Sequence, residues 1–425
     1  MDIEPEETKK EIWQHIILNG HHKQLSVLNP SFEKGVLMSI EGLKPFEKKD
    51  KTGNDIKPTV EDANNIKRSI YSEFFKKPFK NLLILSGAGS SLDVGGSLMS
   101  QLWTKVDNEY KKGEINGFEL IRKEVKYTSD KKDLEALLSQ IDGYSKFADN
   151  KEISIGTEKF KLSEIKDTIF EIIKNSCTIP KPKSLYPHKT FLEKLLQRKQ
   201  TSPRVKIFTL NYDLMFEYAA TDVNAIIIDG FSFTYPRTFS GRLFDYDIVQ
   251  REGSKIQEED NFIERVFHLH KLHGSLNWER VAEKVIVSEK PQKPLLVYPR
   301  EAKYEDSYEQ PFFEMMARFQ RSLRINNDTL LVCVGYSFND KHINAAIEEA
   351  LNQNPSFRLA VIDPSFADSE VSYSLKEIKS IAENTERILM VSETFRDFAN
   401  FFPEIKTYDS DNYVTINLKN DQSKD

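Results

Sequence analysis

The stretch "NLLILSGAGSS", residues 81 to 91, joins a short apolar run to a glycine-rich turn. An apolar run of this length, closed by glycine, is typical of a strand buried on both faces of a parallel sheet. Glycines after such a strand let backbone N–H groups approach a phosphate, and the end of a following helix favours its charge. The spacing is not the GxGxxG of dehydrogenases, and the turn lacks the lysine of a P-loop. Strand-to-helix packing alone would also require such glycines, so this stretch predicts a strand and leaves the role of the turn open.

Comparable strands follow along the chain, separated by helical or long polar segments. They are "VKIFTLNYD" (205–213), "NAIIIDGF" (224–231), "RVFHLHKLHG" (265–274), "PLLVYP" (294–299), "TLLVCVGYSF" (329–338), "FRLAVID" (357–363) and "RILMVSETF" (387–395). This alternation is the pattern of a parallel sheet wound with helices on both faces. We therefore predict an α/β fold with a doubly wound, mainly parallel, Rossmann-like sheet.

The domain organisation follows from the same reading. Residues 1–75 are polar and predict a mostly helical N-terminal extension, and residues 76–405 form the sheet domain. Within that domain, residues 97–200 predict a helical insertion, because "LSEIKDTIFEIIKNS" repeats apolar residues at three- and four-residue spacing. The tail, residues 406–425, is polar and is expected to fray.

Composition excludes several classes of protein. The chain has 425 residues and a net charge of −6, which gives no overall electrostatic basis for direct nucleic-acid binding. Its two cysteines, Cys177 and Cys333, cannot form a disulfide framework or a four-cysteine zinc ribbon. The N-terminus is acidic and polar, and no apolar run is long enough to cross a membrane. We expect a cytoplasmic protein that does not enter membranes.

Three of the eight histidines lie within "HLHKLH", residues 268 to 273. Strand alternation places His268 and His270 on one face and His273 on the other, where it precedes Gly274. The first two could meet a metal, but no carboxylate or cysteine is arranged beside them in the sequence, so we expect core histidines and no metal. His273 stands where the strand stops and is the better candidate for chemistry.

Polar residues mark the ends of two further strands. Asn211 and Asp213 close the strand that begins at residue 205, and Gly335 and Ser337 follow the strand that begins at residue 329. The carboxyl ends of parallel strands meet at one edge of a sheet, where ligands bind. Asn and Asp also end strands for local reasons, because their side chains satisfy turn backbone groups. Each motif alone is therefore ambiguous.

Together, "GAGSS", "TLNYD", "KLHGS" and "GYSFND" resemble, in chain order, the NAD-binding motifs of the sirtuin fold. The resemblance covers scattered islands between about residues 80 and 365. It implies that Asn211 holds the nicotinamide ribose and a nucleophilic water, that Asp213 faces the carboxamide, and that His273 is the general base. It further implies that the remaining NAD-binding residues are Gly87, Ala88, Gly89, Ser90 and Ser91 at the diphosphate, Gly335 and Ser337 at the adenosine half, and Asp363 at the adenosine ribose.

The chain differs from sirtuin deacylases in two features. The chain lacks the zinc-ribbon cysteines of sirtuin deacylases, and "SSLDVGGSLM" replaces their aspartate–phenylalanine–arginine segment. It looks instead like the bacterial sirtuin-like proteins that hydrolyse NAD against phage. That resemblance implies an NAD+ glycohydrolase with NAD as substrate and no metal, a homo-oligomer, and a HerA-type ATPase as a partner. One alternative is an NAD-dependent deacylase or ADP-ribosyltransferase. Another is a catalytically inactive, nucleotide-binding scaffold subunit of an ATPase complex.

Overall fold

The computed structural model describes most of the chain. The described residues are 13–20, 24–28, 38–40, 44–45, 48–56, 59–130, 132–148, 151–199, 202–250, 262–296, 310–325, 328–366 and 371–403. Within these ranges, no helix combines the length and the apolar character needed to span a bilayer.

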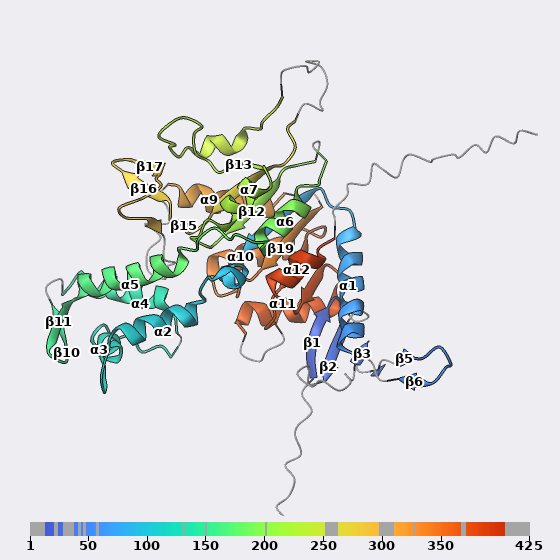
Figure 1. Ribbon diagram of the computed structural model, residues 1–425, viewed down its shortest axis with the longest axis horizontal. Coiled ribbons are helices and arrows are strands. Elements are labelled where there is room, and N and C mark those ends of the chain that lie inside the picture. Colours follow the sequence, from blue (N-terminus) through green and yellow to red (C-terminus); the bar gives the residue numbers. More distant parts are fainter. Residues whose placement is uncertain are drawn as a thin grey trace, which may run out of the picture.

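One sheet of eleven strands organises the molecule, in the order β13-β14-β12-β7-β19-β20-β21-β1-β2-β3-β4 (Figure 1). Its first seven strands are all parallel, namely β13 (Ile226–Ile228), β14 (Val266–Lys271), β12 (Val205–Thr209), β7 (Asn81–Ser86), β19 (Thr329–Val334), β20 (Arg358–Ile362) and β21 (Ile388–Val391). The predicted mainly parallel α/β sheet is confirmed.

The N-terminal segment differs from the expected mostly helical extension. It adds four antiparallel strands to the sheet beside β21, namely β1 (Trp13–Leu18), β2 (Gln24–Leu28), β3 (Met38–Ile40) and β4 (Lys44–Pro45). A small hairpin, β5 (Lys48–Lys49) with β6 (Asp55–Ile56), precedes the helix α1 (Val60–Lys76). Of these strands, β1 joins the sheet by pairing with distant β21, and the other three follow it by antiparallel pairing between neighbours in the chain.

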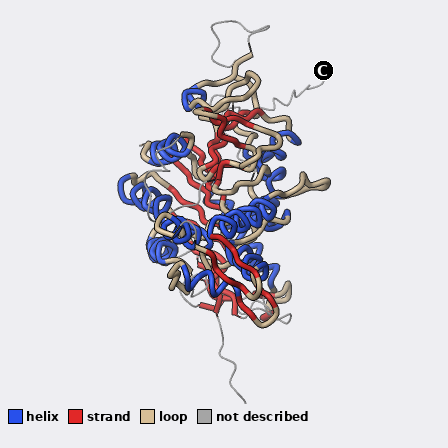
Figure 2. Tube along the Cα trace, turned by 90° about the vertical axis from the view of Figure 1, so that its left-hand side faces the viewer, coloured by secondary structure: helices blue, strands red, loops and turns tan. Residues whose placement is uncertain are grey.

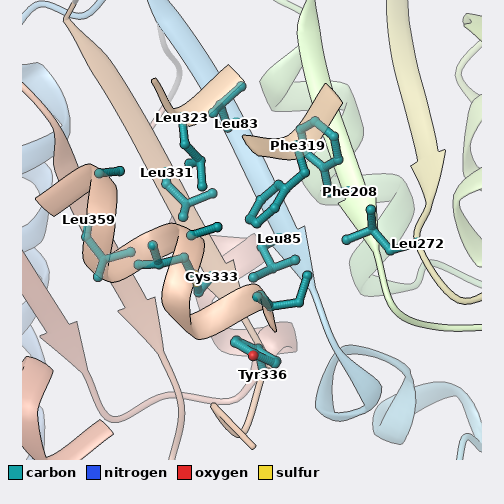
Figure 3. Close-up of a cluster of buried hydrophobic side chains, with 14 of the residues drawn as sticks. Leu83, Leu85, Phe208, Leu272, Phe319, Leu323, Leu331, Cys333, Tyr336 and Leu359 are labelled. Carbon is teal, nitrogen blue, oxygen red and sulfur yellow. The ribbon is translucent and has the colours of Figure 1, made fainter. Parts of the chain in front are cut away.

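Alternate residues of the central strands face two separate layers of helices (Figure 2). Leu82 and Ile84 of β7 face α1 and the helices α6 (Pro187–Leu195), α7 (Met215–Asp222) and α12 (Phe395–Phe401). Leu83 and Leu85 face the helices α9 (Phe312–Leu323), α10 (Lys341–Gln353) and α11 (Tyr373–Asn384). Figure 3 shows the second layer, where Phe319 from α9 packs among side chains from β7, β12 and β19. The sheet is thus buried on both faces.

The insertion has a core of its own and projects from the sheet (Figure 1). Its elements are the helices α2 (Met99–Glu109), α3 (Gly117–Glu124), α4 (Leu134–Ser145) and α5 (Leu162–Cys177), with the hairpins β8 (Lys111–Lys112) to β9 (Ile115–Asn116) and β10 (Glu152–Ile155) to β11 (Glu158–Lys161). Four helices and two hairpins thus make up this segment. The buried residues of its core lie between Leu102 and Ile173, whereas α6 packs in the main core.

A histidine in α6 is enclosed by aromatic rings. His188 has no exposed surface and lies between Phe216 and Phe395, with ring centroids 5.0 and 5.1 Å away. Neither ring nitrogen has a hydrogen-bond partner among the described residues. Burial lowers the pKa of His188 to about 4, although Asp213 and Asp93 oppose the shift.

This histidine links stability to pH. An unfolded histidine takes up a proton below about pH 6.5, whereas folded His188 resists protonation until about pH 4. Its contribution to folding is therefore fully present above pH 6.5 and is lost as the pH falls through that window. We expect His188→Phe to make the slope of unfolding free energy against pH shallower there, by up to about 1.4 kcal/mol per pH unit. Urea unfolding at several pH values measures this slope. The control is His342→Gln, at an exposed position, which should leave the slope unchanged. An unchanged slope in His188→Phe would contradict the lowered pKa of His188.

Candidate active site

Two glycine turns contact each other at the carboxyl edge of the sheet. The first leads from β7 into the 3-10 helix η1 (Ala88–Val94), and the second follows β19. The N–H of Gly89 donates to the carbonyl of Gly335 at 2.9 Å, and that of Gly87 donates to Val334 at 3.0 Å. A Cβ on Gly335 would lie 2.2 Å from the nitrogen of Ser90, and one on Gly87 would lie 2.6 Å from the Gly335 carbonyl oxygen.

The contact between the two turns therefore requires these glycines. The N–H groups of Gly87, Gly89 and Ser90 already have acceptors within the chain, the last being the Gly87 carbonyl at 3.0 Å. Packing between the turns accounts for the glycines of the loop without a ligand. Diphosphate binding by Gly87, Ala88, Gly89 and Ser90 stays a prediction.

Gly335→Ala tests this packing. Gly335 has a φ of +58°, so alanine would add left-handed backbone strain to a clash with the neighbouring turn. We expect the free energy of unfolding to fall by about 2–4 kcal/mol, measured by urea denaturation. Gly143→Ala is the control, because a Cβ at that position in α4 meets nothing within 4 Å. Equal stability of the two variants would refute the packing argument.

Side chains from these strand ends form a hydrogen-bonded cluster. The hydroxyl of Ser91 donates to Oδ2 of Asp213 at 2.7 Å. Nδ2 of Asn211 donates to the hydroxyl oxygens of Ser91 at 3.0 Å and Ser90 at 3.1 Å. Ser90, Ser91 and Asp213 are buried, and Asn211 is half-buried. Residues about 120 positions apart are thus brought together, as expected of strand ends that meet at one edge.

The sheet register explains why Asn211 and His273 lie on neighbouring strand ends. Thr209, at the end of β12, pairs with Lys271, at the end of β14. Asn211 and His273 each follow those paired residues by two positions. The two parallel strands therefore deliver both side chains to the same edge of the sheet.

His273 bonds to a carboxylate from the second helical layer. Its Nε2 lies 3.2 Å from Oδ2 of Asp340, the N-cap of α10. Oδ1 of Asp340 accepts the N–H groups of His342 and Ile343. Burial raises the pKa of Asp340, but the bond from His273 and these N–H groups outweigh it and hold the pKa below its usual value. An ionised Asp340 favours hydrogen on Nε2, which leaves Nδ1 as the acceptor.

The contact between Asp340 and His273 joins residues 67 positions apart and was not predicted. A polar residue following a strand could have suggested it, although no local spacing identifies the partner.

Gly274 serves a structural contact. Its φ is +94°, and a Cβ there would lie 2.2 Å from the carbonyl oxygen of Leu295. The strand β15 (Gly274–Ser275) pairs here with β18 (Leu295–Leu296). The absence of a side chain at Gly274 therefore makes room for the backbone of β18.

His268 and His270 are buried, as predicted. Phe244 stacks on His270 with ring centroids 4.2 Å apart and planes 11° apart. Burial lowers the pKa of His268 to about 4 and that of His270 well below its ordinary value. In the part of the chain that the structure describes, no group of three or more His, Cys, Asp or Glu is arranged to hold a metal ion. Both histidines are neutral members of the core.

Ser337 and Asp363, which were also predicted to hold the adenosine half, have hydrogen-bond partners within their own turns. Ser337 is exposed, and its hydroxyl accepts a bond from Asn339 at 3.1 Å. Asp363 follows β20 and accepts both the N–H and the hydroxyl of Ser365 at 2.8 Å. The latter arrangement caps a local turn, which was the alternative for an aspartate at a strand end.

The insertion reaches the same edge of the sheet. Tyr212, between Asn211 and Asp213, packs against the insertion core. Glu135 in the first turn of α4 has its pKa raised well above the usual value by burial and by the nearby carboxylates of Asp133 and Asp340. A carboxyl group of the insertion therefore lies near the partner of His273.

A cavity of about 230 Å³ opens at the opposite edge of the sheet. Asn81 and Lys206, from the amino ends of β7 and β12, line it together with His268. Arg204 in its wall binds Asp247 in a two-point ion pair at 2.9 and 3.1 Å. This cavity is separate from the cluster at the carboxyl edge, where the candidate chemistry lies.

Part of the chain that carries these site residues is similar to a known protein family. The family model described as "SIR2-like domain" matches residues 205–381. This segment, less than half of the chain, is similar to SIR2-like domains. The match begins with β12 and ends in α11, so that it includes Asn211, His273 and Asp340 but not the glycine turn after β7. SIR2-like proteins include NAD-dependent enzymes.

Two solved structures are similar to this chain. One is a serine-to-alanine variant of a Sir2 homologue with ADP-ribose, at 12% identity and a TM-score of 0.37, covering 78% of this chain and 94% of the other. The second is a histidine-to-alanine variant of Sir2 with a deacetylated p53 peptide and 3'-O-acetyl ADP-ribose, at 12% identity and a TM-score of 0.36, covering 79% and 96%. No curated protein matches the sequence.

Proposed function

We propose that the SIR2-like domain is an NAD+ glycohydrolase that releases nicotinamide and ADP-ribose. The observation that carries the proposal is the cluster of Ser91, Asn211 and Asp213 on the strand end beside the His273–Asp340 pair. It combines amide and hydroxyl groups, a buried carboxylate and an oriented imidazole at the edge of the sheet where parallel α/β proteins bind ligands. The motif order, which resembles that of sirtuins, supports the same reading.

In the proposed reaction, the bond between the ribose carbon and the nicotinamide nitrogen breaks, and its electron pair leaves with neutral nicotinamide. A water oxygen forms the new bond to that carbon, and Nδ1 of His273 takes up the water proton. Asn211 orients the ribose and the water, and Asp213 faces the carboxamide. Positioning and electrostatic stabilisation of an oxocarbenium-like transition state are the main demands on the protein.

The rest of the dinucleotide is assigned by the motif resemblance. The turn of residues 87–91 would hold the diphosphate, and Gly335 and Ser337 the adenosine half. Asp363 would bond the adenosine ribose through a carboxylate that also caps its own turn. NAD+ is the substrate in this scheme, and no step requires a metal.

Nicotinamide release tests the proposal. The purified full-length chain is incubated with NAD+, with and without an acyl-lysine peptide, and products are separated by chromatography. Equal amounts of nicotinamide and ADP-ribose without peptide are the expected result. Peptide-dependent release with an acylated ADP-ribose product would favour the deacylase, transfer of ADP-ribose to protein would favour the transferase, and no release under any condition would favour the scaffold.

The biological part of the proposal is an effector that depletes NAD+ during bacterial antiphage defence. Resemblance to NAD-hydrolysing sirtuin-like proteins and the count of only two cysteines support it. We further propose a cytoplasmic homo-oligomer that binds a HerA-type ATPase. Co-expression of both chains, followed by light scattering and by NAD+ measurement in phage-challenged cells, tests this. Unchanged NAD+ during infection would contradict the effector role.

A further inference from the structure

A buried lysine joins the two strand ends that carry Asn211 and His273. Lys271 is the last residue of β14 and is 2% exposed. Its ammonium lies 2.9 Å from Oε1 of Glu217, in the first turn of α7. It also donates to the backbone carbonyl of Asp213 and lies 3.5 Å from that of Tyr212.

The three acceptors match the three hydrogens of an ammonium group. Two of them belong to the backbone between Asn211 and the start of α7, and the third anchors that helix. An apolar pair of similar size would often stabilise a buried site as well as an ion pair does, because desolvation of the charges offsets their attraction. A contribution to folding stability therefore does not explain why a lysine occupies this position. Its contacts with the carbonyls of Tyr212 and Asp213 do explain it, because an apolar side chain could not make them.

From this geometry we infer that Lys271 and Glu217 are positioning residues for the reaction. They fix the turn at residues 211–213 relative to β14, and hence Asn211 relative to His273. The activity part of this inference rests on the proposed NAD+ cleavage. The side chains of Lys271 and Glu217 do not hydrogen-bond to Asn211 or Ser91. They act instead through the backbone that carries Asn211 and Asp213.

Loss of positioning should appear in kcat. Displacement of a reacting group by about 1 Å costs roughly 100-fold in rate, while contacts to other parts of a substrate persist. The double variant Lys271→Met with Glu217→Leu removes the hydrogen bonds to the turn carbonyls without leaving either charge unpaired. We expect a thermal midpoint close to that of the unmodified protein, a kcat about 10- to 100-fold lower, and a KM for NAD+ that changes little.

A second lysine–glutamate pair with a buried lysine serves as the control. Lys67 of α1 lies 3.0 Å from Glu393, with side chains 7% and 3% exposed, and it also donates to the carbonyl of Ser392. Lys67→Met with Glu393→Leu should leave kcat unchanged. The inference is overturned if the Lys271 double variant keeps its kcat, or if the control pair loses as much.

Hydrogen exchange separates this inference from the proposed function. If the unmodified protein does not cleave NAD+, the glycohydrolase proposal fails, and backbone exchange then decides the role of the pair. Faster exchange across residues 210–218 in the double variant, with no change across 329–334, supports positioning. Unchanged exchange in both segments overturns it. Should the double variant fail to fold, Glu217→Gln takes its place with the same supporting and overturning results.

Discussion

His273→Ala should reduce the rate of nicotinamide release from NAD+ by at least about 100-fold, the lower bound for loss of a general base. His273 is half-buried and contacts Oδ2 of Asp340, while the helix cap uses Oδ1, so removal of the imidazole should leave the fold intact. Initial rates of nicotinamide formation, with circular dichroism as the check on folding, measure the effect. The magnitude is large because Asp340 holds the imidazole with one nitrogen as acceptor.

A matched histidine variant sharpens this test. His342 is exposed on α10, two residues from Asp340, and His342→Gln should keep full activity. Turnover of His273→Ala within a few-fold of the unmodified protein would remove His273 from the mechanism. Equal losses in both variants would point instead to disturbance of α10.

Asn211→Ala should lower kcat for NAD+ cleavage by about 100- to 1,000-fold, the range seen when an oriented polar group is removed from a reaction centre. The amide of Asn211 bonds both Ser90 and Ser91, and Ser91 bonds Asp213. Alanine would therefore remove the proposed contact with the ribose and also the hydrogen bonds to the two serine hydroxyls. Steady-state kinetics with NAD+ give kcat and KM separately.

The control for Asn211 lies far from the cluster. Asn384, at the end of α11, is exposed and bonds only along its own helix, to the carbonyl of Ser380. Asn384→Ala should retain both kinetic constants. If Asn211→Ala raises KM with kcat unchanged, the residue contributes uniform binding of substrate and does not orient the reacting groups.

Local patterns in the sequence were enough to predict the parallel half of the sheet. The buried strand at residues 81–86 is an unbroken apolar run, and residues 205–209 and 329–334 repeat that pattern. The strands of the N-terminal segment were not predicted, since β1 enters the sheet through pairing with β21, more than 350 positions away. Pairing of that kind leaves no local repeat.

Some contacts of the candidate site could likewise be predicted from the sequence, and others could not. The meeting of Ser91, Asn211 and Asp213 was expected, because strand ends converge, while their roles toward NAD+ remain predictions. The partner of His273 and the ion pair of Lys271 were not predicted. Each of these contacts joins residues more than 50 positions apart, and nothing in the local sequence around one partner specifies the other.

The separate core of the insertion has a consequence for control of the site. A unit with its own core can shift or open without unfolding the sheet. Tyr212 packs against that core, and its two neighbours in the chain are the proposed reacting residues Asn211 and Asp213. If the proposed NAD+ cleavage is correct, a protein that binds the outer helices of the insertion would act on the site through the contact of Tyr212 with the insertion core.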